Sequence, residues 1–258
     1  MKTKQFIYST AAAVFLILSL NVTAKSDEFT KRISKSFEVD KDATLELKNK
    51  FGKIHCSNWD KNSISIEVEI TVDASSQERA NKYFDRIDVD ITGDRNKVSA
   101  ITNFENKVFN SNGNDISIDF MISMPEAVNL EVNHKFGDLI IENVSGNSSI
   151  DLGYGNFDIR KLEGNSNMLD IQFSEGKIVF IKNADLQLKY SELNIDEAIS
   201  LNAETNFSEL EIGKVDVLTL ESGYDDGYIG FVRDLDIEAG FSDIEVRSLE
   251  ERLVAEFD

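Results

Sequence analysis

The sequence predicts an all-β chain: a single-chain β-solenoid (β-helix) with coils of about 17 residues, preceded by a β-rich N-terminal cap that contains one short α-helix. Three observations predict this fold. An aromatic residue recurs every 16 to 19 residues through the second half of the chain. Apolar residues recur at fixed offsets from that aromatic residue, and apolar and polar residues alternate within each unit.

Residues 1–24 are expected to be a signal peptide. Lys2 and Lys4 precede an apolar run at 11–20, and small residues at 22–24 precede the expected cleavage site. The run is too short to span a bilayer comfortably, and a membrane anchor is the alternative. No cysteine lies near the cleavage site, so a lipoprotein signal is not expected. We therefore expect an exported chain, periplasmic or at the extracellular surface, with no membrane anchor after signal removal.

The chain is strongly acidic and has a single cysteine. It has 27 Lys+Arg against 47 Asp+Glu, a net charge of −20, and removal of the two lysines in residues 1–24 makes it about −22. Such a charge repels nucleic acid and anionic lipid, so no nucleic-acid partner is expected. Cys56 alone excludes an internal disulfide framework. We expect it to be a small buried apolar residue, with pairing to another chain as the alternative.

Residues 25–125 are expected to form the N-terminal cap, which includes an early solenoid unit at 37–59. In that unit Leu47, Phe51 and Ile54 have the same relative spacing as residues of the later units. This region is expected to cover the open edge of the solenoid, which would otherwise invite strand addition from other molecules. Further strands are expected at 64–72, 87–92, 97–103 and 116–124, with the turn Asn-Ser-Asn-Gly-Asn-Asp at 110–115 between the last two.

One short helix is expected within the cap, at about 76–87. Ser75 and Glu78 have the spacing of a capping box, in which each side chain accepts a hydrogen bond from the other residue's backbone. One face of this helix is marked by Ala80, Tyr83, Phe84 and Ile87.

Residues 126–258 are expected to be the solenoid repeat array. With each recurring aromatic residue taken as position 0, position −4 is apolar in every unit and position +5 is Ile or Val. Each unit reads as a strand, a tight turn and a second strand. Two short strands cannot cover their own apolar face, so the units must stack, with identical positions about 4.8 Å apart.

The recurring aromatic residues are expected to lie in the core. The period of two places Leu235, Ile237, Ala239 and Phe241 on one side of a strand. We therefore expect the aromatic rings to stack at one interior corner of the solenoid, and an exposed sugar-binding stripe is the alternative. The members of this expected core aromatic ladder are Phe51, Phe136, Tyr154, Phe173, Tyr190, Phe207, Tyr224, Phe241 and Phe257.

Two columns of acidic residues are expected on the outer face. Position +2 holds Asp138, Asn156, Glu175, Glu192, Glu209, Asp226 and Asp243. Position −3 holds Asn133, Asp151, Asp170, Gln187, Glu204, Glu221 and Glu238. Repulsion between exposed carboxylates is modest in water and salt, so a solvated face that keeps the protein soluble is the first interpretation. A weak divalent-cation surface is the alternative, because Ca²⁺ prefers several carboxylate oxygens.

The chain resembles a family of exported bacterial proteins known as putative adhesins, which carry a domain of unknown function expected to form a β-solenoid. The resemblance rests on residues 49–91, with their Phe-Gly, Trp-Asp and helix elements, and on the units of pattern [FY]-[GS]-x-[IL]-x-[IV] from Phe136 onward. It covers essentially the whole chain after residue 24. It implies the fold and export, and it supplies no catalytic residues.

Catalytic, cofactor and metal sites are not expected. His55 and His134 occupy scaffold positions, and adjacent His55 and Cys56 point to opposite faces of a strand, which is poor geometry for a shared metal. The Gly153-x-Gly155 pair lacks the third glycine and the following helix of a dinucleotide site. Carboxylate pairs are too numerous in this chain to single out an acid/base couple. The sequence therefore predicts no enzyme.

Three functions remain, and the first is a non-enzymatic, adhesin-like binding scaffold of the cell envelope or surface, with a glycan, surface or envelope-protein partner. The second is a structural, self-assembling or periplasmic envelope module, because the last coil carries Leu253, Ala255 and Phe257 and shows no polar cap before Asp258. Self-association would then use this C-terminal edge. The third is a polysaccharide-active β-helix enzyme, although the short coils offer no inserted loops to build a cleft.

Overall fold

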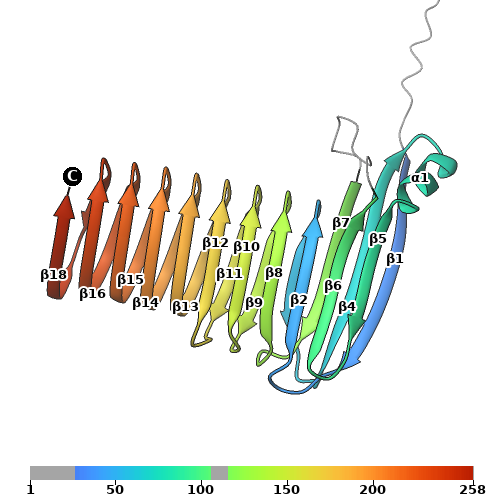
Figure 1. Ribbon diagram of the computed structural model, residues 1–258, viewed down its shortest axis with the longest axis horizontal. Helices are drawn as coiled ribbons and strands as arrows, with labels where there is room; N and C mark the ends of the chain where they lie inside the picture. Colours follow the sequence, from blue (N-terminus) through green and yellow to red (C-terminus); the bar gives the residue numbers. More distant parts are fainter. Residues whose placement is uncertain (1–26, 106–115, 258) are drawn as a thin grey trace, which may run out of the picture.

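The computed structural model describes residues 27–105 and 116–257, and these form a straight β-solenoid with one helix at its N-terminal end (Figure 1). The predicted fold class is confirmed. The expected signal peptide and the expected turn at 110–115 lie outside the described residues.

Each coil of the array contains two strands joined at the aromatic residue. In the first complete coil, β8 (Asn129–Lys135) leads into the turn at Phe136 and then into β9 (Leu139–Val144). The next coil begins with β10 (Ser148–Gly153), which pairs in parallel with β8. The first strands of successive coils therefore form one parallel sheet, and the second strands form another.

The register repeats through the rest of the array. In each pairing of β13 to β16, a residue lies beside the residue 17 positions later, as Leu186 lies beside Ala203. From Glu175 to Gly240 the second strand of one coil runs continuously into the first strand of the next. The strands after β10 are β11 (Asn156–Leu162), β12 (Asn167–Gln172), β13 (Glu175–Lys189), β14 (Glu192–Asn206), β15 (Glu209–Gly223), β16 (Asp226–Gly240), β17 (Asp243–Val246) and β18 (Leu249–Phe257).

The predicted apolar columns form the core. Residues at positions −4 and +5 are at most 4% exposed from Val132 through Ile237. Leu253 is 54% exposed. It lies on β18, which pairs with β16 along one edge, and no described strand pairs with its other edge. At position +3 two coils carry glycine where the others carry a large apolar residue. A Cβ on Gly176 would lie 2.5 Å from the Phe157 ring, and a Cβ on Gly227 would lie 2.5 Å from the Ile244 side chain. In each case the large side chain of one coil fills the space left by the glycine of a neighbouring coil.

The N-terminal region continues both sheets of the array. The early unit consists of β2 (Thr44–Lys50) and β3 (Ile54–Asn58), joined at Phe51. β2 pairs in parallel with β8 on one side and with β6 (Lys97–Phe104) on the other. β3 pairs in parallel with β9 and with β7 (Ile116–Met124). The coil around Phe51 is therefore a true member of the stack, although it precedes β8 by about 80 residues.

Antiparallel strands end the stack at this side. β5 (Ile87–Gly93) pairs with β6, and β4 (Ser63–Ala74) pairs with β7. β1 (Asp27–Glu38) pairs with β4, and α1 (Gln77–Phe84) contacts β1, β4 and β5 (Figure 1). The strands at this end of the stack are therefore added mainly by antiparallel pairing.

The helix begins one residue later than the capping-box spacing predicts. Ser76 is the N-cap, and its Oγ accepts a hydrogen bond from the Arg79 backbone N–H at 3.3 Å. Ser75 instead accepts from the Arg79 guanidinium at 3.1 Å. Ala80 is buried, and Tyr83 and Phe84 pack partly against the core, as the predicted face requires. The predicted end of the helix at about 87 is wrong, because the helix ends at Phe84 and Ile87 is the first residue of β5.

Candidate functional site: a groove between aromatic and acidic columns

The turn at each recurring aromatic residue has an unusual backbone. Among the described residues, the non-glycine residues with positive φ are eight aromatic residues, with φ between 50° and 63°. Glycine and asparagine adopt left-handed backbone most readily, and a bulky residue in this conformation destabilises the fold by about 1–3 kcal/mol. These residues are Phe51, Phe136, Tyr154, Phe173, Tyr190, Phe207, Tyr224 and Phe241.

In the later coils the residue after the aromatic residue is a serine that holds the turn in place. The Ser191 Oγ accepts a hydrogen bond from the Ser174 backbone N–H at 3.1 Å and donates one to the Lys189 carbonyl at 2.8 Å. Ser208 repeats the first contact one coil later, at 3.2 Å from the Ser191 N–H. These serines are buried. The position after the aromatic residue therefore faces inward and forms a serine ladder inside the corner.

The aromatic ladder lies outside the solenoid, so the prediction that it is core is wrong. The seven rings from Phe136 to Phe241 are between 43% and 76% exposed. Leu235, Ile237 and Ala239 do point inward, but the left-handed residue then interrupts the alternation and turns the Phe241 side chain outward. Phe51 is half-buried, and the side chain of Phe257 lies outside the described set.

The predicted stacking of the rings is confirmed. Successive rings from Phe51 to Phe241 have centroids 4.8 to 5.4 Å apart and planes within 13° of parallel. At the cap end, Phe104 meets Phe51 edge-on at 6.0 Å. Because each inner ring has a neighbour on both faces, the ladder presents ring edges to solvent along its length.

Gly52, Gly137 and Gly155 take the place of serine in the coils nearest the cap, and one later coil has an aspartate there. Asp225 takes the inward position, and it is 4% exposed. Its Oδ1 accepts from the Ser208 N–H at 2.7 Å, and its Oδ2 accepts from the Thr205 hydroxyl at 2.7 Å, the Ser222 hydroxyl at 2.8 Å and the Gly223 N–H at 2.9 Å. These four donors satisfy the buried carboxylate. Asp225 is therefore a structural replacement for serine.

A groove runs beside the ladder. The position two residues after each aromatic residue points outward, so the rings form one wall, acidic side chains form the other and the serine ladder forms the floor. The groove has a volume of about 1170 Å³ and extends from Gly155 to Asp243. A hollow of about 250 Å³ adjoins the acidic wall at the last coils and adds Glu211 and Glu245 to its border.

The acidic wall has no compensating cations. Among the described residues, Glu175, Glu192, Glu209, Asp226 and Asp243 form no ion pair. Repulsion from Glu175 and Glu209 raises the pKa of the Glu192 carboxyl above its ordinary value. At the cap end the column is less negatively charged, because Asn156 replaces an acidic residue and its amide donates a hydrogen bond to Asp138 at 3.2 Å.

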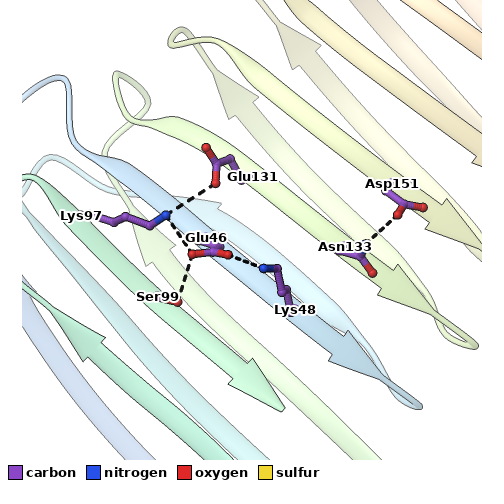
Figure 2. Close-up of polar contacts among 7 residues, drawn as sticks. All are labelled: Glu46, Lys48, Lys97, Ser99, Glu131, Asn133 and Asp151. Carbon is purple, nitrogen blue, oxygen red and sulfur yellow. Dashed lines mark hydrogen bonds and ion pairs between the residues drawn. The ribbon is translucent and has the colours of Figure 1, made fainter. Parts of the chain in front are cut away.

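On the outer face near the cap, in contrast to the groove, the acidic side chains are paired with lysines (Figure 2). Glu46 on β2 lies 2.6 Å from the Lys48 ammonium and 2.9 Å from the Lys97 ammonium on β6. These two lysines lower the pKa of Glu46 to about 2. Lys97 also reaches Glu131 on β8 at 3.8 Å. The charges on this face are therefore paired across three strands, whereas those of the groove are not.

The acidic column at position −3 lies on the outer face of the first-strand sheet. Asp151 accepts from the Asn133 amide at 2.6 Å (Figure 2), and Asp170 accepts from the Gln172 amide at 2.9 Å. A hollow of about 400 Å³ is bordered by both residues and by Glu204 and Glu221. In the described part of the chain, neither column gathers three or more ligating side chains that could hold a metal ion.

The two histidines and the cysteine occupy scaffold positions. His134 is fully buried, with Nδ1 3.3 Å from the Asn49 carbonyl and Nε2 3.1 Å from the Gly52 carbonyl, and burial lowers its pKa. Cys56 is fully buried, as predicted, and burial raises its pKa to about 12. His55 is partly exposed on the opposite face of β3.

Within residues 27–105 and 116–257, no helix has the length and apolar character needed to cross a membrane.

No protein-family model and no curated protein matches this chain. It is similar to the solved structure of a putative adhesin from Bacteroides fragilis, with 15% identity, 88% of this chain and 96% of that chain covered, and a TM-score of 0.39. A putative cell adhesion protein from Clostridium sporogenes has 10% identity, coverage of 88% and 100%, and a TM-score of 0.36. A putative lipid binding protein from Parabacteroides distasonis has 10% identity, coverage of 88% and 96%, and a TM-score of 0.37.

The solved structures similar to this chain thus include proteins named putative adhesins, as the resemblance predicted. At these identities and TM-scores the similarity assigns no ligand or activity to this chain.

Proposed function

We propose that the chain is a non-enzymatic, exported binding scaffold of the cell envelope or surface, adhesin-like in its mode of action, and that it binds its partner in the groove beside the aromatic ladder. The observation that carries this proposal is the exposure of seven aromatic rings on left-handed backbone.

The energetics of the turn favour a binding role for the rings. Left-handed backbone costs about 1–3 kcal/mol for a bulky residue. Each ring shares two stacks with its neighbours, so the ladder supplies about one stack per ring, worth about 0.5–1.5 kcal/mol. Stacking therefore offsets the strain only in part, and glycine or asparagine would satisfy the backbone without strain. A continuous exposed apolar stripe is the kind of surface that proteins keep for an interaction.

The size of the groove favours a macromolecular partner. From Phe173 to Asp243 it repeats one ring, one inward residue and one acidic residue on successive coils, so a ligand that occupies one coil would leave the others empty. A partner with repeating chemistry, or an extended segment of one, can occupy several coils at once. Multiple weak contacts then add along the solenoid axis.

The test combines location with binding. Cells that produce the full chain are fractionated and treated with protease while intact, and the purified chain is tested against cells, a glycan panel and envelope proteins. The double variant Tyr190→Asn/Phe207→Asn removes two rings and keeps residues that tolerate left-handed backbone. Met168→Thr, at an exposed position on β12, is the matched control.

We expect the ring variant to lose binding and the control to retain it. Cytoplasmic retention of the chain, or equal binding by both variants, overturns the proposal.

Self-association is a second candidate. Leu249, Leu253 and Val254 on β18 are 38%, 54% and 46% exposed, and the pairing of β18 within the described residues is with β16. A second copy that paired with this strand would cover these side chains. Sedimentation of the purified chain over a hundredfold range of concentration tests it, since a monomer at all concentrations excludes this candidate.

A further inference from the structure

We propose that the groove binds an extended, lysine-rich segment of a polypeptide, which lies along the solenoid axis with its ammonium groups on the acidic wall. This inference rests on the proposed function and deepens it, because it names the chemistry of the partner.

The charge of the groove selects a cation. The five carboxylates from Glu175 to Asp243 face the groove without an ion pair among the described residues, and they lie on successive coils. Repulsion from Glu175 and Glu209 on the neighbouring coils already raises the pKa of Glu192. A row of positive groups relieves this repulsion, whereas uronic acids, sulfated glycans, nucleic acid and anionic lipid increase it. The opposite wall supplies apolar surface.

The geometry of the ladder selects lysine. Glycans and guanidinium groups bind aromatic residues on the ring faces. The ring faces of the inner members are covered by their neighbours, as for Tyr190, which has Phe173 at 4.9 Å and Phe207 at 5.2 Å. Ring edges are accessible instead. A lysine stem can lie along apolar ring edges while its ammonium group reaches a carboxylate, and it needs no ring face.

The length of the groove selects an extended polymer. The groove spans the six coils from Gly155 to Asp243. At about 4.8 Å per coil this is roughly 24 Å, which about seven residues of extended polypeptide would cover. Alternate side chains of such a segment point to the same side, so every second residue can face the acidic wall. A single metal ion or a short diamine would occupy one or two coils only.

The test measures fluorescence anisotropy of a labelled octapeptide of alternating Lys and Thr as the purified full chain is added. The groove variant Glu192→Gln/Glu209→Gln/Asp226→Asn removes three negative charges from the acidic wall. The matched variant Glu204→Gln/Glu221→Gln/Glu238→Gln removes three from the column at position −3. Both variants have the same net charge, so a difference between them reports the groove and not the acidity of the whole chain.

We expect the groove variant to bind the peptide about tenfold more weakly than the unmodified chain, and the matched variant less than about threefold more weakly. An octapeptide of alternating Glu and Thr should not bind. Binding should weaken with added salt. The bound peptide should also bring the pKa of Glu192, followed by NMR of its carboxyl carbon, back toward the ordinary value, because ammonium groups stabilise the carboxylate form.

Equal losses in the two variants would show binding by net charge alone and would overturn the inference. Spermine that binds as tightly as the peptide would overturn the choice of a polypeptide.

The ring variant Tyr190→Asn/Phe207→Asn separates this inference from the proposed function. If it loses binding to cells or envelope proteins while the lysine peptide binds neither form, the scaffold function stands and the inference fails. If the lysine peptide binds in the groove while the chain is retained in the cytoplasm, the exported function fails and the inference stands.

Discussion

The rings of Tyr190 and Phe207 lie parallel within 2°, with their centroids 5.2 Å apart, although both residues have left-handed backbone. The stack therefore joins two residues that are each strained, and the two effects can be separated by substitution.

Phe207→Ala and Phe207→Gly should differ in stability, with the glycine variant the more stable by about 1 kcal/mol. Both remove the ring and its two stacks, but only alanine keeps a Cβ on left-handed backbone. Glycine in a regular strand is usually the less stable of the two, so the order is reversed here. Urea unfolding of the two variants measures the difference. An alanine variant equal to or more stable than the glycine variant would contradict the role of strain.

Ser191→Ala should lower the stability by about 1–3 kcal/mol, because it leaves the buried Ser174 N–H without its acceptor. Ser34→Ala, at an exposed position on β1, is the control and should stay within about 0.5 kcal/mol of the unmodified chain. Thermal unfolding followed by circular dichroism measures both. Equal melting temperatures would show that water or a local shift replaces the serine ladder.

Glu46 should make stability depend on pH in the acid range. Its folded pKa of about 2 lies below the ordinary 4.5, so its ion pairs with Lys48 and Lys97 stabilise the fold fully above pH 4.5. That contribution should be lost as pH falls from about 4.5 to about 2. Glu46→Gln should cost about 1–3 kcal/mol at pH 7 and nothing at pH 2. Urea unfolding at several pH values measures it, and a pH-independent cost would contradict the assignment.

The Glu192 carboxyl should affect the pH dependence of stability in the opposite direction to Glu46. Repulsion from Glu175 and Glu209 raises its folded pKa, so the ionised side chain destabilises the fold above that pKa. The penalty should fade as pH drops through the raised pKa toward 4.5. Glu192→Gln should therefore be slightly more stable than the unmodified chain at pH 7 and equal to it near pH 3. A loss of stability at pH 7 would mean that Glu192 has a favourable partner.

The sequence predicts the core well because in-register stacking puts identical positions above one another. Ile195 and Leu186 are buried for the reason that their columns are apolar in every coil. Exposure of the ladder was only the alternative prediction, although a signal that favours it exists. Before the turn the inward-facing residues are at positions −4 and −2, which are even numbers. After the turn they are at +3 and +5, which are odd numbers. Strict alternation cannot join the two series, so two consecutive residues must face outward near the turn, and one of them is the aromatic residue at position 0.

The serine ladder was missed for the same reason. The sequence analysis predicts only a tight turn at this point of each unit, yet Ser174, Ser191 and Ser208 are buried in the corner. β1 was also not predicted. Its apolar residues Phe29, Ile33 and Phe37 are only half-buried, and lysines lie between them, as is usual for an edge strand. Because Lys31 and Lys35 take the positions between them on the same face, the strand lacks the apolar alternation that identifies inner strands.

The constant step of 17 residues between β13 and β16 has an evolutionary consequence. Tandem duplication of one such segment in the gene would add one ring, one inward serine and one carboxylate, and would leave every existing contact unchanged. The reach of this surface can therefore grow or shrink by whole copies, independently of the cap that ends the stack.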